Sequence, residues 1–213
     1  MIPETRRDDL PSDVLVGGPG AFVCVVGPSG AGKDTLIARA RDRLQTLPVF
    51  RFPRRLVTRP VNGWEDHASL SMEAFDYGVA ADAFALSWRA HGIGYALERT
   101  VQDAVRDGAV VVANISRGSI EDARRRFGRA YVVLVTAPPD IIAARLSLRG
   151  RDSAADMHAR MERNRIFSGE LSPDFVIVND EEPETGAARL VSFLKEVAST
   201  SRAPHGLAEH RHP

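Results

Sequence analysis

The chain has 213 residues, of which 44% are hydrophobic and 26% are charged. These proportions are typical of one compact domain with small insertions, and they exclude a chain that is disordered throughout. The 28 basic and 28 acidic residues balance, which argues against a protein that binds nucleic acid through bulk positive charge. The apolar runs are too short to span a membrane, no secretory signal is visible, and a single cysteine allows no internal disulfide. We therefore expect a cytoplasmic protein without membrane or nucleic-acid partners.

Short apolar runs alternate with segments of helical periodicity along the middle of the chain. Strands are predicted at residues 21–26, 109–115, 131–136 and 175–178, and helices at 33–44, 97–107, 120–127, 138–148 and 187–194. Repeated alternation of this kind predicts an α/β fold, with a parallel sheet of about five strands covered by helices.

Four segments lie outside this alternation. Residues 1–20 and 200–213 lack an apolar period, and we expect them to be flexible tails on either side of a domain at 21–199. Residues 53–95 and 149–172 are rich in arginine, glycine and small polar residues, and they are candidate insertions into the domain. In α/β folds, binding sites form where such insertions meet the carboxyl ends of the strands.

The first predicted strand is joined to the first predicted helix by Gly27-Pro28-Ser29-Gly30-Ala31-Gly32-Lys33. In this context G-x-x-x-x-G-K forms a phosphate-binding loop. Glycines let backbone N–H groups turn toward a polyphosphate at the positive end of the helix dipole, and the lysine adds a charge at the β- and γ-phosphates. Only two of the 28 basic residues are lysines, so lysine here indicates a need for a compact ammonium. We expect residues 27–35, Asp34 and Thr35 included, to bind ATP.

Asp34 stands where the usual motif has a Ser or Thr that holds Mg²⁺. A carboxylate suits this ion, and Asp34 would hold it either directly or through a water molecule. Alternatively, Thr35 supplies a hydroxyl ligand. A third interpretation is that Asp34 only adds a favourable negative charge to the first turn of the helix. The sequence leaves these alternatives open.

Further motifs resemble guanylate kinase and its relatives in order and spacing. They are Val57-Thr58-Arg59-Pro60, Ser71-Met72-Glu73-Ala74-Phe75, and Trp88 with Tyr95. The resemblance extends from Ala21 to Lys195. It implies a P-loop kinase fold in which residues 53–95 form an acceptor-binding insertion and residues 149–172 form an arginine-rich lid.

Several positions depart from the guanylate kinase pattern. Ser87 replaces the Glu that reads guanine in that family, Asn62 replaces its second phosphate-binding Arg, and Asn114-Ile115-Ser116 replaces its Asp-x-Asp. These departures, with Gly32-Lys33-Asp34, Glu65-Asp66-His67 and Arg117, closely resemble the ribose 1,5-bisphosphate phosphokinases. That resemblance implies transfer of the γ-phosphoryl group of ATP to ribose 1,5-bisphosphate, which forms 5-phosphoribosyl 1-diphosphate in phosphonate breakdown.

The expected site residues fall into groups by role. Lys33, Arg149 and Arg160 are expected to be catalytic, because phosphoryl transfer depends on cations that neutralise the migrating group. For the two arginines a solvated helix face is the alternative. Arg59, with Tyr95, is expected to grip an acceptor phosphate, because a guanidinium fork fits phosphate oxygens. The resemblance adds Ser87, Asn114, Ser116 and Arg117 to the acceptor site and Asn179 to the adenine site. Glu65 and His67 either bind ribose hydroxyls or belong to a polar loop.

Two other functions compete with a bisphosphate sugar kinase. A nucleoside monophosphate kinase would use the same phosphate loop with a different acceptor. A catalytically silent interaction module of the guanylate kinase type is disfavoured, because Gly32, Lys33 and the lid arginines are intact. The sequence indicates no oligomeric state, and it predicts a phosphorylated sugar as the small-molecule partner.

Overall fold

The computed structural model describes residues 20–60, 67–90, 92–148 and 172–200, and the predicted tails and lid lie almost wholly outside them. The elements follow in chain order: β1 (Ala21–Val26), α1 (Lys33–Leu44), β2 (Phe50–Arg51), β3 (Arg55–Val57), β4 (His67–Ser69), α2 (Met72–Ala80), β5 (Phe84–Ala90), β6 (Ile93–Glu98), α3 (Thr100–Arg106), β7 (Val110–Asn114), the short 3₁₀ helix η2 (Arg117–Ser119), α4 (Ile120–Arg126), β8 (Ala130–Thr136), α5 (Pro139–Leu148), β9 (Phe175–Val178) and α7 (Pro183–Thr200).

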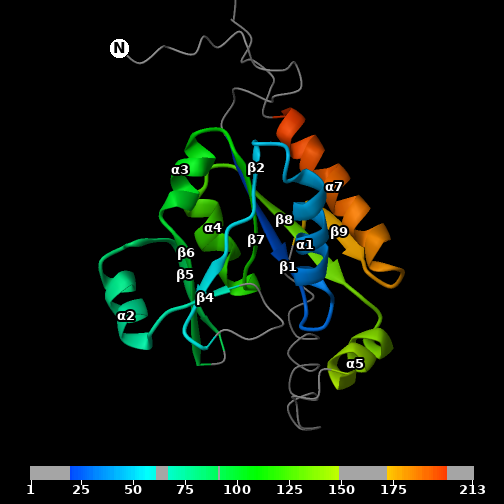
Figure 1. The fold of residues 1–213 in the computed structure, drawn as a ribbon, viewed down its shortest axis with the longest axis horizontal. Helices are drawn as coiled ribbons and strands as arrows, with labels where there is room; N and C mark the ends of the chain where they lie inside the picture. Colours follow the sequence, from blue (N-terminus) through cyan, green and yellow to red (C-terminus); the bar gives the residue numbers. More distant parts are fainter. Residues whose placement is uncertain (1–19, 61–66, 91, 149–171, 201–213) are drawn as a thin grey trace, which may run out of the picture.

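Five strands form one parallel sheet in the order β2-β7-β1-β8-β9. The central strand, β1, is buried along its whole length. Helices lie on both sides of this sheet (Figure 1). The expected α/β fold with a parallel sheet of this size is thus confirmed.

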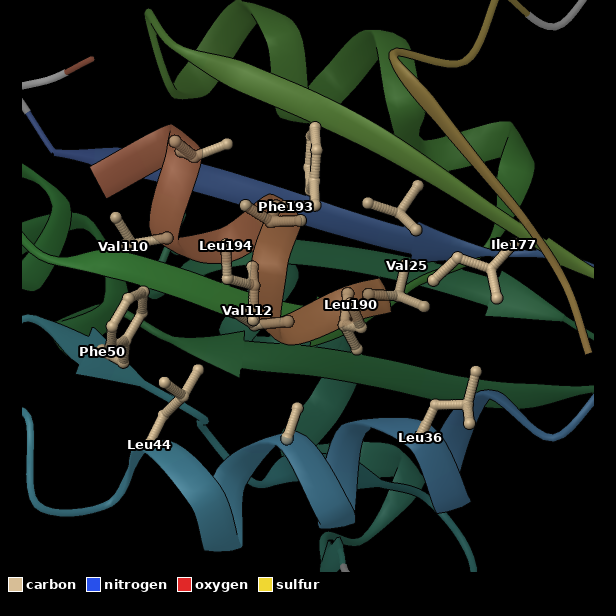
Figure 2. Close-up of a cluster of buried hydrophobic side chains, with 14 of the residues drawn as sticks. Val25, Leu36, Leu44, Phe50, Val110, Val112, Ile177, Leu190, Phe193 and Leu194 are labelled. Atoms are coloured by element: carbon tan, nitrogen blue, oxygen red, sulfur yellow. The ribbon is translucent and has the colours of Figure 1, made fainter. Parts of the chain in front are cut away.

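One face of the parallel sheet packs against α1 and α7. Alternate residues of β1, namely Ala21, Val23 and Val25, point into this layer, as the two-residue period of a strand requires. Leu36 and Leu44 of α1 and Leu190, Phe193 and Leu194 of α7 fill it, with Val110, Val112 and Ile177 from the neighbouring strands (Figure 2). Burial of an apolar side chain of this size stabilises the fold by about 1.5–3 kcal/mol.

The opposite face of the sheet packs against α3, α4 and a second, smaller sheet. Phe22, Cys24 and Val26 of β1 point into this layer, and the ring of Phe22 stacks on that of Phe127 with 4.2 Å between their centroids. Leu86 and Leu97 of the second sheet join the same buried cluster. The second sheet is therefore fixed to the parallel sheet through a shared apolar core.

The second sheet has the strand order β4-β3-β6-β5. β3 and β4 are parallel, and β6 is antiparallel to both β3 and β5. Ser71 caps α2 by accepting a hydrogen bond from the backbone N–H of Ala74 at 3.0 Å. Phe75 of α2 packs against Gly94, where a larger residue would clash with its ring. The described residues of the predicted insertion at 53–95 thus contribute to a second layer beside the parallel sheet.

Two features differ from the sequence expectations. The predicted helix at 97–107 begins later, because Leu97 lies in β6 opposite Leu86 and α3 begins at Thr100. Leu97 is fully buried, and its spacing from Val101 also fits a helix. This spacing explains why the helix was predicted to begin at residue 97. In addition, β2 to β6 and α2 were not predicted. β2, β3 and β4 have only two or three residues each and carry too little pattern. The longer β5 and β6 lie mostly in the segment that was predicted to be an insertion.

Among the helices that the structure describes, none is both long enough and apolar enough to cross a membrane.

Candidate active site

The predicted phosphate loop lies where four parallel strands end. β1 leads into Gly27, β7 ends at Asn114, β8 ends at Thr136, and β9 leads into Asn179. The backbone N–H of Asn179 donates to the carbonyl of Thr136 at 2.7 Å, so two of these ends are tied together. Ligands of α/β folds bind at this edge of the sheet.

The loop has the backbone shape that its glycines permit. Gly27 has φ 146° and lies so close to the carbonyl of Val135 that a Cβ atom would be 1.9 Å from its oxygen. Gly32 precedes α1 with φ 94°, a left-handed conformation that L-residues rarely adopt. The ammonium of Lys33 donates to the carbonyls of Gly27 at 3.0 Å and Pro28 at 2.9 Å. The charge therefore sits inside the loop, next to the N-terminus of α1.

Asn179 holds this loop from outside. Its amide nitrogen donates to the carbonyl of Ala31 at 2.7 Å, and the side chain is buried. The same nitrogen lies 2.4 Å from the position that a Cβ on Gly32 would occupy. Asn179 was predicted from its place after the last strand to bind adenine; the structure puts its side chain against the phosphate loop, and the adenine contact stays a prediction.

Two buried polar atoms near Gly32 have no hydrogen-bond partner within the described part of the chain. They are Oδ1 of Asn179 and Nη1 of Arg145 in α5. The Arg145 nitrogen is 3.8 Å from the position of a Cβ on Gly32. Buried polar groups are rarely left unsatisfied, so the Arg145 nitrogen marks a place where a polar ligand fits. Oδ1 of Asn179 instead lies toward α7, 3.1 Å from the position that a Cβ on Gly186 would occupy. Arg145 precedes the predicted arginine-rich lid at 149–172 and was not among the predicted site residues.

The carboxylate of Asp34 points toward the second sheet. Its Oδ1 accepts a hydrogen bond from Nδ2 of Asn114 at 2.8 Å and lies 3.5 Å from Nη2 of Arg55. The Asp34 side chain is 43% exposed, whereas that of Arg55 is 12% exposed. A carboxylate at the N-terminus of α1 is also favoured by the helix dipole. Asp34 and Asn114, 80 positions apart, are thus brought together as predicted site residues, and Arg55 joins them.

The oxygen of Asp34 fits a magnesium ion better than that of Thr35. Mg²⁺ prefers carboxylate, phosphate and water oxygens, and Asp34 places its carboxylate beside the phosphate loop within reach of Asn114. Thr35, one residue along α1, is exposed. The described residues contain no cluster of three or more His, Cys, Asp or Glu side chains able to hold a metal. An ion at Asp34 would therefore draw its other ligands from ATP phosphates and water.

Aromatic side chains line the second sheet next to Arg55. The rings of Trp88 and Tyr95 stack with 5.5 Å between centroids and 6° between planes. The guanidinium carbon of Arg55 lies 5.8 Å from the centroid of the Tyr95 ring, within the range of a cation–π contact. Tyr95 is therefore placed beside the cation Arg55, and its predicted role with Arg59 stays a prediction.

Other predicted acceptor residues in the described part of the chain lie next to β3, in β4 and at the start of η2. Arg59 follows β3, and its carbonyl accepts a hydrogen bond from Oγ of Ser69 at 2.9 Å. His67 in β4 is fully buried, and neither of its ring nitrogens has a hydrogen-bond partner within the described part of the chain. Ser116 precedes η2, and burial lowers the pKa of the Arg117 guanidinium next to it.

Ser87 stands on the other face of the second sheet. It pairs with Ala96, whereas the adjacent Trp88 pairs with Tyr95. Side chains alternate between the two faces of a strand, so Ser87 shares a face with Arg89, which covers the ring of Phe75 in α2. This pairing puts Ser87 on the sheet face opposite Tyr95, and its predicted contact with the acceptor stays a prediction. Glu65, Arg149 and Arg160 lie outside the described residues, so their predicted roles stay predictions.

Comparison with known proteins identifies the relatives of this chain. No family model matches it. The ribose 1,5-bisphosphate phosphokinase PhnN of Methylobacterium radiotolerans is 48% identical over 83% of this chain and 98% of its own length. The protein of the same name from Acidiphilium cryptum is 44% identical over 82% of this chain and 92% of its own length. Guanylate kinase from Anaplasma phagocytophilum has the same fold, with a TM-score of 0.60, 20% identity, and coverage of 88% of this chain and 91% of that chain. With its phosphate loop, its second sheet and these relatives, the chain belongs to the ribose 1,5-bisphosphate phosphokinase family.

Proposed function

We propose that this protein transfers the γ-phosphoryl group of ATP to ribose 1,5-bisphosphate, forming ADP and 5-phosphoribosyl 1-diphosphate. One observation carries the proposal. Asp34, next to the phosphate loop, is paired with Arg55 of the second sheet, and Arg55 in turn lies over the ring of Tyr95. Relatives at 44–48% identity are named for this activity. The purine-reading Glu of guanylate kinases is replaced by Ser87, whose hydroxyl cannot make the same pair of charge-assisted hydrogen bonds to guanine.

The reaction needs no strong general base. An oxygen of the phosphate on C1 of the sugar attacks the γ-phosphorus, and the bond from the γ-phosphorus to the bridging oxygen of the β-phosphate breaks, which releases ADP. The attacking oxygen already carries negative charge at neutral pH, so the protein has to bring two anions together and neutralise them. Cationic and backbone N–H donors are the groups that do this.

On the ATP side, the loop at residues 27–33 would cradle the β- and γ-phosphates with its backbone N–H groups. Lys33 would exchange the carbonyls of Gly27 and Pro28 for phosphate oxygens, which gives its ammonium better partners. Asn179 would maintain the shape of the loop by donating a hydrogen bond to the carbonyl of Ala31.

Magnesium would be held by the carboxylate of Asp34. When bound, the ion would offset the negative charge of the triphosphate. Asn114 would orient the carboxylate by donating to its Oδ1. The predicted water-mediated arrangement is compatible with the same placement.

On the acceptor side, Arg59 and Tyr95 are proposed to bind a phosphate of the sugar, and Glu65 and His67 its hydroxyl groups. Ser87, Ser116 and Arg117 are retained as candidates for the periphery of the pocket. Arg149 and Arg160 are proposed to close over the triphosphate and to exclude water, which limits wasteful hydrolysis.

A comparison of acceptors tests this function. The full chain is incubated with MgATP and either ribose 1,5-bisphosphate, GMP or ribose 5-phosphate, and ADP release is followed with a coupled assay. Phosphorus NMR then identifies the product. We expect turnover with ribose 1,5-bisphosphate and the appearance of a diphosphate on C1. A higher kcat/KM with GMP would instead identify a nucleoside monophosphate kinase and overturn the proposal.

A further inference from the structure

Arg55 connects the two halves of the site. It begins β3 in the second sheet, yet its Nη2 lies 3.5 Å from Oδ1 of Asp34 at the end of the phosphate loop. Its guanidinium carbon is 5.8 Å from the centroid of the Tyr95 ring, and Tyr95 in turn stacks on Trp88. The aromatic pair limits the orientations that the guanidinium can adopt. Arg55 is thus a cation held between the donor and acceptor sides.

Asp34 does not depend on Arg55 to stabilise its charge. Asp34 is 43% exposed and already accepts a hydrogen bond from Asn114, so water and an amide stabilise its charge. The separation of 3.5 Å is longer than the 2.7–2.9 Å of a strong charge-assisted hydrogen bond. A phosphate dianion attracts a guanidinium more strongly than a carboxylate at this distance does. The guanidinium is better suited to a doubly charged partner.

The chemistry of the proposed reaction supplies such a partner. The acceptor group is itself a phosphate, so a dianion has to approach the triphosphate, and like charges repel at short distance. A planar guanidinium binds two phosphate oxygens at once. We propose that Arg55 binds the acceptor phosphate and guides it toward the γ-phosphoryl group, leaving the carboxylate of Asp34 as the phosphate arrives. This role rests on the proposed function and gives it a specificity residue for phosphate acceptors.

Binding measurements test the role without relying on activity. Ribose 1,5-bisphosphate is titrated by calorimetry into the full-length wild type, Arg55→Met and Arg51→Met, all without nucleotide. Arg51 is a matched control, because it is an exposed arginine in β2 that donates to the carbonyls of Pro48 and Phe50. Loss of a hydrogen-bonded charge pair predicts about 10- to 100-fold weaker binding for Arg55→Met. We expect Arg51→Met to bind like the wild type. Equal affinities of Arg55→Met and wild type would overturn the inference.

A double variant separates acceptor binding from a merely structural pairing with Asp34. If Arg55 only neutralised Asp34, Asp34→Asn combined with Arg55→Met would restore wild-type affinity for ribose 1,5-bisphosphate. We expect the double variant to bind as weakly as Arg55→Met, since the acceptor still lacks its cation. Thermal unfolding of each variant confirms that the fold is retained. Restored affinity in the double variant would overturn the inference.

Binding and turnover of ribose 1,5-bisphosphate by the wild type test the proposed function separately. Should it neither bind nor phosphorylate ribose 1,5-bisphosphate, that function fails, and the same variants are titrated with GMP, whose phosphate is the alternative acceptor. Weaker GMP binding by Arg55→Met alone would still support Arg55 as the acceptor-phosphate residue. Equal GMP affinities would exclude it.

Discussion

Lysine is rare in this chain, and one of its two lysines stands at the end of the phosphate loop. Lys33 points its ammonium at the carbonyls of Gly27 and Pro28, which are the partners available before a triphosphate arrives. An arginine is larger and planar and would not fit the same pair of carbonyls. The residue is thus chosen for its shape as well as its charge.

Replacing Lys33 with alanine removes the positive charge inside the loop. We expect kcat to fall by at least ~100-fold, as is typical when a group that stabilises the transition state is lost. Steady-state assays of ADP release measure the effect. Lys195→Ala is the matched control, because it removes the only other lysine, which is exposed on α7. An active Lys33→Ala variant would contradict the site assignment.

Replacing Asn179 with alanine leaves the carbonyl of Ala31 without its donor. Leaving a buried acceptor without its hydrogen-bond partner costs about 1–3 kcal/mol. Here we expect this loss to distort the phosphate loop. We expect the KM for ATP to rise by about 10-fold, since 1.4 kcal/mol corresponds to a factor of ten. The KM for the acceptor serves as the internal control, and an equal rise in both would argue against a role specific to the loop.

At the scale of elements, α1 and α7 are joined by apolar packing more than by charge. Arg39 and Arg43 of α1 form ion pairs with Glu184 of α7, but exposed pairs contribute only about 0–1 kcal/mol. Leu36 and Leu190 lie in the buried layer between these helices and the sheet (Figure 2). The helices are therefore held in place by their leucines.

Leu190→Ala tests this packing. The side chain is fully buried, and a leucine-to-alanine change in a core typically costs 2–5 kcal/mol, so we expect unfolding in urea at a clearly lower denaturant concentration, with about 3 kcal/mol lost. Arg189→Ala, at an exposed position one residue earlier in α7, is expected to stay within about 0.5 kcal/mol of the wild type. A similar loss in both variants would mean that α7 is held by its surface.

Four strands of the parallel sheet, β1, β7, β8 and β9, were predictable because each is a mostly apolar run and the helices between them have a regular period; the two-residue β2 was not. The second sheet was not, because β3 and β4 are three residues each and are stabilised by partners distant in sequence. The phosphate loop was predictable because its glycines are needed locally. Arg55 had no such signature: its importance comes from Asp34, and only the folded chain brings the two together.

At the scale of the whole molecule, the chemical reactivity of Cys24 can be used to follow global unfolding. It is the only cysteine of the chain and is fully buried in the central strand. Burial raises the pKa of its thiol to about 12, and the thiolate is the reactive form. We expect no reaction with a thiol reagent at pH 8 in buffer and one thiol per chain in urea, measured by absorbance. Rapid labelling of the native protein would contradict the described core.

The same raised pKa predicts how alkali affects stability. The unfolded chain loses the thiol proton near its ordinary pKa of 9, and the native state holds it up to about pH 12. Between these values the unfolded state binds fewer protons, so stability falls as the pH rises. Cys24→Ala removes this contribution, and urea titrations of both proteins at pH 8 and pH 10.5 are expected to show a smaller loss for the variant.

The hydrogen bond from Asn179 to Ala31 spans 148 positions of the chain. During synthesis on a ribosome, the phosphate loop emerges early, whereas its anchor emerges only after β9. A nascent chain that stops before β9 therefore lacks the brace that shapes the loop. We expect the capacity to capture nucleotide to arise late, once translation has delivered the final strand.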